Sequence, residues 1–300
     1  MHKKYFVILA LLGLHFILGI RTIQHNSPTF DESIHLYAGC VYLKTGNYYI
    51  SAWHHHPPLA EMIAAIPVMV FLKPKLFLDH PAYQEFRIAE LCNMFLYYNS
   101  VNAEKLLNTG RLGIFFVFST ALFFCIYWWA KQMFGLVPAY VALTMYAFSP
   151  TILAHSTLVT TDFGGACLFF ISVCTYLVFL RKRTFSSSLI AGLCLGMALA
   201  AKYSTLVLLP LLTLIWITAF FIAHDKKAEQ PPVKLHGVIV LACILVIAFI
   251  YRFGSIGYFF EGIQTLIKEN QQGRSSFLMG SYSMTGWWYY FIVLLLIKST

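Results

Sequence analysis

The chain has 300 residues, of which 59% are hydrophobic and 11% are charged, and its mean hydropathy is +0.70. This composition excludes an ordinary soluble domain and predicts an all-α integral membrane protein, a multi-span helical bundle with surface helices in its first outer loop. The net charge of +9 does not indicate nucleic-acid binding, because the basic residues form short clusters between apolar segments rather than a continuous stripe.

The chain begins with an apolar segment that follows a short basic start. His2, Lys3 and Lys4 precede an apolar run that contains no small-residue cleavage motif, so we predict an uncleaved first span over residues 1–20. Because lysines flanking a span are retained in the cytoplasm, the N-terminus is expected on the cytoplasmic side.

A polar stretch over residues 28–59, PTFDESIHLYAGCVYLKTGNYYISAWHHHPPL, comes next. Thr29 and Glu32 have the spacing of a capping box, and Gly46 supplies a helix stop. We therefore predict a helix over residues 30–45. Apolar residues at helical spacing suggest that it is amphipathic and lies on the membrane surface, with Asp31 and His35 one turn apart on the same side.

The apolar segment 59–72 decides the topology. Its about 14 residues are fewer than the roughly 20 that a bilayer crossing needs, so we expect it to remain on the outer surface. The later apolar segments are predicted to cross, and they lie at residues 112–130, 136–154, 163–180, 189–201, 206–223 and 235–251, with a last one starting near Trp287.

With 59–72 outside, the basic clusters fall in the cytoplasm, as the positive-inside rule requires. They comprise Lys131, the cluster 181–183, Lys226, Lys227, Lys234 and Lys298. The same choice places Asp162, Lys202 and the ionisable residues of 21–111 on one outer face. We predict an extracytoplasmic region with interfacial helices over 21–111 and a long outer loop over 252–286.

Acidic and basic residues on this outer face are candidates for chemistry. A carboxylate at a helix N-terminus is stabilised by the helix dipole by roughly 0.3 to 1 kcal/mol, so Asp31, Glu32 or Asp162 could be structural. Arg111 and Lys202 could simply reach the membrane interface. A site that releases an anionic leaving group, however, needs fixed cations beside a base, and the set meets that need better than any one member.

The run His54, His55, His56 offers imidazoles, which are common transition-metal ligands. Consecutive histidines cannot easily all face one ion, and the sequence shows no second ligand cluster at a diagnostic spacing. We therefore predict no metal site and no cofactor, with a divalent metal ion left as the alternative.

Several separated motifs resemble one group of membrane enzymes. FDESIHLYAGCVYLKTGNYY followed by HHHPPLAEMI is similar to the signature of the family-39 membrane glycosyltransferases, which include protein O-mannosyltransferases and bacterial lipid A aminoarabinose transferases. The resemblance continues in order through TGRLGIFFVF, AFSPTILAHSTLVTTDFGGA, GMALAAKYSTLVLLP and SSFLMGSYSMTGWWYYF. It implies a C-type glycosyltransferase fold in the bacterial plasma (inner) membrane, with an extracytoplasmic active site.

The resemblance also implies partners and residue roles. The partners are a polyprenyl-phosphate sugar donor and a hydroxyl-bearing acceptor, which is a protein, a lipid or a glycan. Asp31 and Glu32 match the acidic pair, with Asp31 as general base and Glu32 holding the acceptor or the loop. The residues assigned to the donor phosphate are Arg111, Lys202 and His56, and those assigned to the acceptor or donor pocket are Asp162 and His35.

The domain is expected to occupy residues 1–300 and to be truncated at its C-terminus. Its last apolar segment has only about 12 to 14 residues, again fewer than the roughly 20 of a crossing, and the family's last motif usually continues into further helices. The predicted reaction is an inverting sugar transfer, characteristic of a mannosyltransferase-like hexosyltransferase. Two alternatives remain open, a transporter or flippase of a lipid-linked sugar and a non-catalytic homologue.

Overall fold

The computed structural model describes residues 2–225, 233–273 and 275–298, and it confirms an all-α membrane bundle apart from one short hairpin. Among these residues, five helical segments are long and apolar enough to cross a bilayer. They lie in α1 (His2–His25), α7 (Ala103–Phe134), α10 (Thr161–Lys182), η2 (Tyr203–Val207) with α12 (Leu208–Asp225), and α13 (Val233–Ile250).

The predicted crossing at 136–154 is broken into two helices. α8 (Leu136–Phe148) and α9 (Pro150–Ser156) meet at a bend of 58°. The break follows from Pro150, which has no N–H to donate and which forces the preceding Ser149 into an extended conformation. The Ser149 hydroxyl then caps α9 by accepting from the backbone N–H of Ile152.

The predicted crossing at 189–201 falls on α11 (Phe185–Ala201), whose 17 residues are about 26 Å long at the α-helical rise. It packs along α10 on one side and α13 on the other. Small residues permit this close packing, because a Cβ atom at Gly192 would lie 2.5 Å from the backbone oxygen of Ile239.

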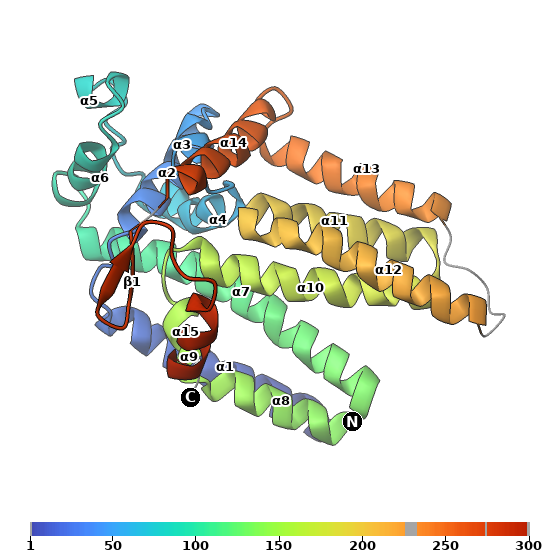
Figure 1. Cartoon of the computed structure of the whole chain (residues 1–300). Helices are drawn as coiled ribbons and strands as arrows, with labels where there is room; N and C mark the ends of the chain where they lie inside the picture. The colour runs from blue at the N-terminus through green and yellow to red at the C-terminus, as the bar shows by residue number, and fades with distance from the viewer. Residues whose placement is uncertain (1, 226–232, 274, 299–300) are drawn as a thin grey trace.

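Short helices gather at one end of the long ones, as Figure 1 shows, and the N-terminus lies at the other end. They are α2 (Glu32–Thr45), α3 (Tyr49–Trp53), α4 (Leu59–Pro67) with the π-helical turn η1 (Val68–Leu72), α5 (Pro81–Gln84), α6 (Ile88–Tyr97) and α14 (Gly257–Gln272). The predicted outer region 21–111 contains most of them. Within this region α7 already begins at Ala103, capped by the Asn102 side chain.

Helix α2 corrects the prediction of an amphipathic surface helix. It ends at Gly46 as predicted, with a left-handed φ of 71°, but every residue from His35 to Tyr42 is buried. A helix that is apolar all round belongs inside a protein, and α2 packs against α4, α6 and α7. Gly39 permits the contact with α4, since a Cβ atom there would lie 2.2 Å from the carbonyl oxygen of Glu61.

The predicted outer loop 252–286 is largely ordered into α14 and an antiparallel hairpin. Strand β1 (Ser276–Leu278) pairs with β2 (Ser281–Ser283), and Ser276 lies opposite Ser283. Met279 and Gly280 both have positive φ, as a tight two-residue hairpin turn requires. The last apolar segment forms α15 (Tyr290–Lys298), and the lysines predicted to be cytoplasmic at 226 and 227 lie outside the described residues.

Candidate active site

A buried ion pair joins the start of α2 to α7. The Arg111 guanidinium donates from Nε to Glu32 Oε1 at 2.8 Å and from Nη2 to Glu32 Oε2 at 2.6 Å. Glu32 also accepts from the backbone N–H groups of Thr29, at 3.0 Å, and Val159, at 2.9 Å. Its bond to Thr29 is the half of the predicted capping box that forms. Four hydrogen bonds thus satisfy the carboxylate.

Arg111 is equally saturated. Beyond Glu32, its guanidinium donates to the Asn108 side chain and to three backbone carbonyls at the end of α1 and just after it, those of Ile23, Asn26 and Ser27. Only 1% of the residue is exposed. All five N–H donors therefore have protein partners, and this geometry disfavours the predicted role of Arg111 in binding a donor phosphate. Glu32 and Arg111 instead form a clamp between segments.

The clamp changes the acidity of Glu32. Burial of the carboxyl acts to raise its pKa, but the hydrogen bonds from Arg111 and from two backbone N–H groups outweigh burial and lower it. The carboxylate therefore stays ionised and holds the loop before α2 at neutral pH. That loop carries Asp31.

Asp31 stands in a different environment from its neighbour. It is exposed and occupies the N-cap position of α2, where its side chain makes no capping hydrogen bond. Asp31 and His35 were expected on the same side of the helix, but Asp31 is exposed whereas His35 is 5% exposed and contacts Glu61. Of the two adjacent carboxylates, only Asp31 is free to accept a proton from another molecule.

A cluster of histidines surrounds a carboxylate that the sequence reasoning overlooked. Glu61, in the first turn of α4, is 1% exposed, and its Oε1 lies 2.6 Å from His35 Nδ1 and 2.9 Å from His54 Nε2. The His56 ring lies 5.0 Å from that of His35 and 5.3 Å from that of His54 between centroids. His55 turns away and contacts Glu269 of α14 at 2.9 Å.

Burial and neighbouring charge perturb the acidity of this cluster. Burial acts to raise the pKa of Glu61, but the imidazoles of His54 and His35 outweigh it and hold that pKa at about 2. Burial, reinforced by His35 and His54, lowers the pKa of His56 to about 3. His56 is therefore neutral at physiological pH, so it can offer a hydrogen bond or a lone pair but no positive charge to an anion.

A second ion pair lies between the start of α10 and the end of α11. The Lys202 ammonium contacts the Asp162 carboxylate, and the neighbouring Thr161 hydroxyl lies 3.2 Å from His56 Nδ1. Both charged side chains remain accessible, with 25% of Lys202 and 60% of Asp162 exposed. Thr161 and His56 thus connect this pair to the histidine cluster.

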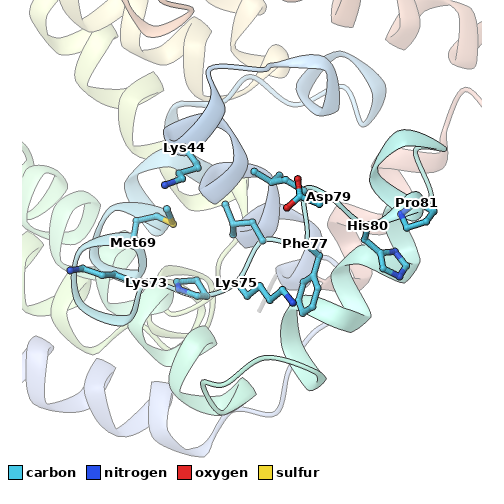
Figure 2. A pocket seen from close by; sticks show the side chains of 11 residues that line it. Lys44, Met69, Lys73, Lys75, Phe77, Asp79, His80 and Pro81 are labelled. Atoms are coloured by element: carbon cyan, nitrogen blue, oxygen red, sulfur yellow. The ribbon is translucent and has the colours of Figure 1, made fainter.

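An apolar cavity of about 490 Å³ extends from Asp162, and we call it the apolar groove. Side chains of α7, α9 and α10 line it, including Leu122, Ile126, Ile152, Phe163 and Phe170. A cavity of about 430 Å³ is lined in part by Thr29, Phe30 and Ser33, which flank Asp31 in the sequence. The larger cavity in Figure 2, of about 720 Å³, lies around Lys44, Lys73 and Lys75 and has no predicted site residue among its described lining.

These features define a class of protein: a helical membrane bundle whose acidic, basic and histidine side chains gather at one end, with an apolar groove reaching them. Within that class, residues 107–251 match the family described as dolichyl-phosphate-mannose-protein mannosyltransferase. The match covers just under half of the chain and supports the resemblance to a protein-mannosyltransferase-like membrane glycosyltransferase seen in the motifs. It includes Arg111, Asp162 and Lys202 but not Asp31. No curated protein and no solved structure matches the chain.

Proposed function

We propose that this protein transfers a sugar from a polyprenyl-phosphate donor to an acceptor hydroxyl, with inversion at the anomeric carbon. The observation that carries the proposal is the Asp162–Lys202 pair at the end of the apolar groove. A lipid-linked sugar phosphate has the same two parts, an apolar chain and an anionic head. The family match supports the same donor class.

Lys202 is the cation that we assign to the donor phosphate. Its ammonium has three donors, so it can contact a phosphate oxygen while it remains paired with Asp162. Arg111 has no such capacity because its donors are all used. His56, whose Nδ1 lies 3.2 Å from the hydroxyl of Thr161, is assigned to the same region.

Asp31 is the base that we assign to the acceptor. Adjacent carboxylates with divergent environments commonly take different roles in catalysis, and here Glu32 is buried and saturated whereas Asp31 is exposed. Glu32 contributes by fixing the loop that carries Asp31. Val159, which donates to Glu32, lies three residues before Asp162, so the clamp positions both acidic residues at one end of the bundle.

The proposed reaction is a single displacement. Asp31 removes the proton from the acceptor hydroxyl as its oxygen forms a bond to the anomeric carbon. The bond between that carbon and the phosphate oxygen breaks, and the electron pair leaves with the phosphate, whose growing negative charge Lys202 stabilises. Attack from the face opposite the phosphate inverts the configuration.

We place this chemistry at the extracytoplasmic face of a bacterial plasma (inner) membrane. The support is the distribution of charge along the long helices. Lys131 lies in the last turn of α7 and Arg181 and Lys182 in the last turn of α10, whereas Asp162 begins α10 and Lys202 follows the end of α11. The positive-inside rule assigns the basic ends to the cytoplasm.

A donor-cleavage assay tests the proposal. The protein in lipid nanodiscs is given radiolabelled mannosyl polyprenyl phosphate and a peptide rich in serine and threonine, and both the released polyprenyl phosphate and the labelled product are measured. Removing a general base lowers rates by about 10²–10⁴-fold, so Asp31→Asn is expected to lose that much. Lys202→Met is expected to lose about 10²–10³-fold, as for other groups that stabilise developing charge.

Matched controls come from the cavity in Figure 2. Asp79→Asn and Lys44→Met repeat the same chemical changes at exposed residues outside the proposed site, and both are expected to retain the native rate. A native rate in Asp31→Asn would remove Asp31 from the role of base, and a product with retained configuration would refute the single displacement. Movement of the intact donor across vesicles without bond cleavage would indicate a transporter instead.

A further inference from the structure

We propose that His35, His54 and Glu61 form a binding site for a transition-metal ion, with zinc as the best-matched metal. One ligand atom from each of the three side chains lies within 4.8 Å of the other two. The three come from the first turn of α2, the residue after α3 and the first turn of α4. The fold therefore assembles two imidazoles and one carboxylate that are far from consecutive in the chain.

The metal-free contacts around Glu61 support this proposal. His54 Nε2 lies 2.9 Å from Glu61 Oε1, but the contact does not have hydrogen-bond geometry, and Glu61 Oε2 and His54 Nδ1 are buried without hydrogen-bond partners among the described residues. A buried carboxylate is costly unless it is fully paired or bound to a metal. An ion between these atoms would use the lone pairs that the protein leaves unsatisfied.

The distances are close to those that zinc requires. Zinc binds imidazole nitrogen and carboxylate oxygen at about 2.0–2.2 Å, so neighbouring ligand atoms in a tetrahedral site lie about 3.2–3.5 Å apart. The present separations of 2.6 and 2.9 Å from Glu61 Oε1 need to widen by less than about 1 Å to reach that spacing. Side-chain rotation of a glutamate is sufficient for such a change.

The ligand set indicates both the metal and the kind of site. Two imidazoles and one carboxylate match the ligands of zinc sites that keep a fourth position open for water or another ligand. His56 is the nearest further imidazole, with its ring 5.0 Å from that of His35. The Nδ1 atom of His56 contacts Thr161 at the start of α10, so His56 lies between the proposed metal ligands and α10. His55 contacts Glu269 instead.

The proposed site agrees with the expectation that the three consecutive histidines do not all face one ion, because only His54 of the run is a ligand. His55 has a left-handed φ of 53° and its side chain contacts Glu269, whereas the rings of His54 and His56 both lie beside that of His35. The other two ligands come from elements that the sequence alone does not bring together. A run of histidines therefore contributes one ligand and one neighbour here, rather than three ligands.

Metal content gives a test that does not depend on sugar transfer. The full-length protein is purified in nanodiscs through a tag without histidines, incubated with zinc chloride, passed over a chelating resin and analysed by elemental mass spectrometry. We expect about one zinc ion per chain. Cobalt in place of zinc is expected to give the visible absorption of a four-coordinate site, which reports direct coordination by protein ligands.

Single substitutions then identify the ligands. His35→Ala and Glu61→Gln are each expected to weaken zinc affinity by at least about 100-fold and to abolish the cobalt spectrum. His25→Ala removes an exposed histidine at the end of α1 and is expected to change neither result. Native-like elution on size exclusion shows which variants remain folded.

The native protein alone can overturn the proposal. If it retains no zinc after chelation and gives no cobalt spectrum, the cluster is a metal-free ion-pair network. Retention that Glu61→Gln and His35→Ala leave unchanged would place the metal elsewhere. Because neither measurement uses donor or acceptor, a negative result leaves the proposed sugar transfer standing, and a failed transfer assay leaves the metal site standing.

Discussion

The Glu32–Arg111 clamp gives the sharpest prediction about stability. Replacing Arg111 with Met leaves the Glu32 carboxylate buried with only its two backbone donors, and it also removes the partners of three carbonyl oxygens near the end of α1. Removing one partner of a buried ion pair typically costs about 3–5 kcal/mol. Because Glu32 is 0% exposed, water cannot replace the lost contact, and we expect a loss of free energy of unfolding in that range.

The reciprocal change, Glu32→Gln, leaves the Arg111 cation buried and should cost a similar amount. The double variant Glu32→Gln/Arg111→Met, however, leaves neither charge unpaired, so it should be more stable than the sum of the single effects predicts. We expect a coupling free energy of at least about 1 kcal/mol. Unfolding in mixed micelles with increasing dodecyl sulfate, followed by tryptophan fluorescence, measures all four proteins under the same conditions.

Additivity would refute this reasoning. If the two single losses sum to the loss of the double variant, the guanidinium and the carboxylate do not stabilise each other. A cost below about 1 kcal/mol for Arg111→Met would likewise show that the buried pair contributes no more than an exposed one. Arg87→Met is the matched control, since Arg87 forms its ion pairs with Glu85 and Glu90 at the surface.

Two further predictions follow from the same end of the bundle. Gly39→Ala should destabilise the protein by about 1–3 kcal/mol, as overpacking does, because the added Cβ would lie 2.2 Å from the backbone oxygen of Glu61. The control Gly13→Ala should be tolerated, because a Cβ there has nothing within 4 Å. Equal unfolding free energies for the two variants would contradict the close approach of α2 to α4. The pKa of Glu32 is lower in the folded protein than the ordinary carboxyl value of 4.5. Stability should therefore fall as the pH drops from 4.5 through the folded-state pKa, because the unfolded chain binds the proton more readily than the folded one. An acid unfolding profile that Glu32→Gln leaves unchanged would refute this.

The helical class and most of the long helices could be predicted from the sequence, because span length and hydrophobicity are local properties. The stop at Gly46 was equally local. The burial of α2 was not predicted, although the sequence indicates it. Residues 34–43, IHLYAGCVYL, contain a single ionisable side chain other than tyrosine and cysteine. A helix with no polar face has no side to present to water, and burial follows.

Partners distant in sequence could not be predicted in this way. Arg111 was recognised as a cation at a helix end, but its role depends on Glu32, which is 79 residues away. Glu61 carried a signal that was missed, since a lone carboxylate beside an apolar run is costly and indicates a nearby partner. Only the packing of α2 against α4 shows that the partners are His35 and His54.

The two adjacent carboxylates at the start of α2 stand in different environments. The Glu32–Arg111 pair ties three segments together, because Glu32 accepts from Arg111 of α7 and from the Val159 N–H, and Arg111 donates to the Asn26 carbonyl just after α1. Asp31 gains a defined position from that arrangement without being buried by it. Asp162 follows Val159 closely, so a shift of the clamp displaces both acidic residues together. We therefore expect substitutions at Glu32 or Arg111 to reduce stability and sugar transfer in parallel, whereas Asp31→Asn should reduce transfer alone, and measuring both quantities on the same preparations separates the two roles.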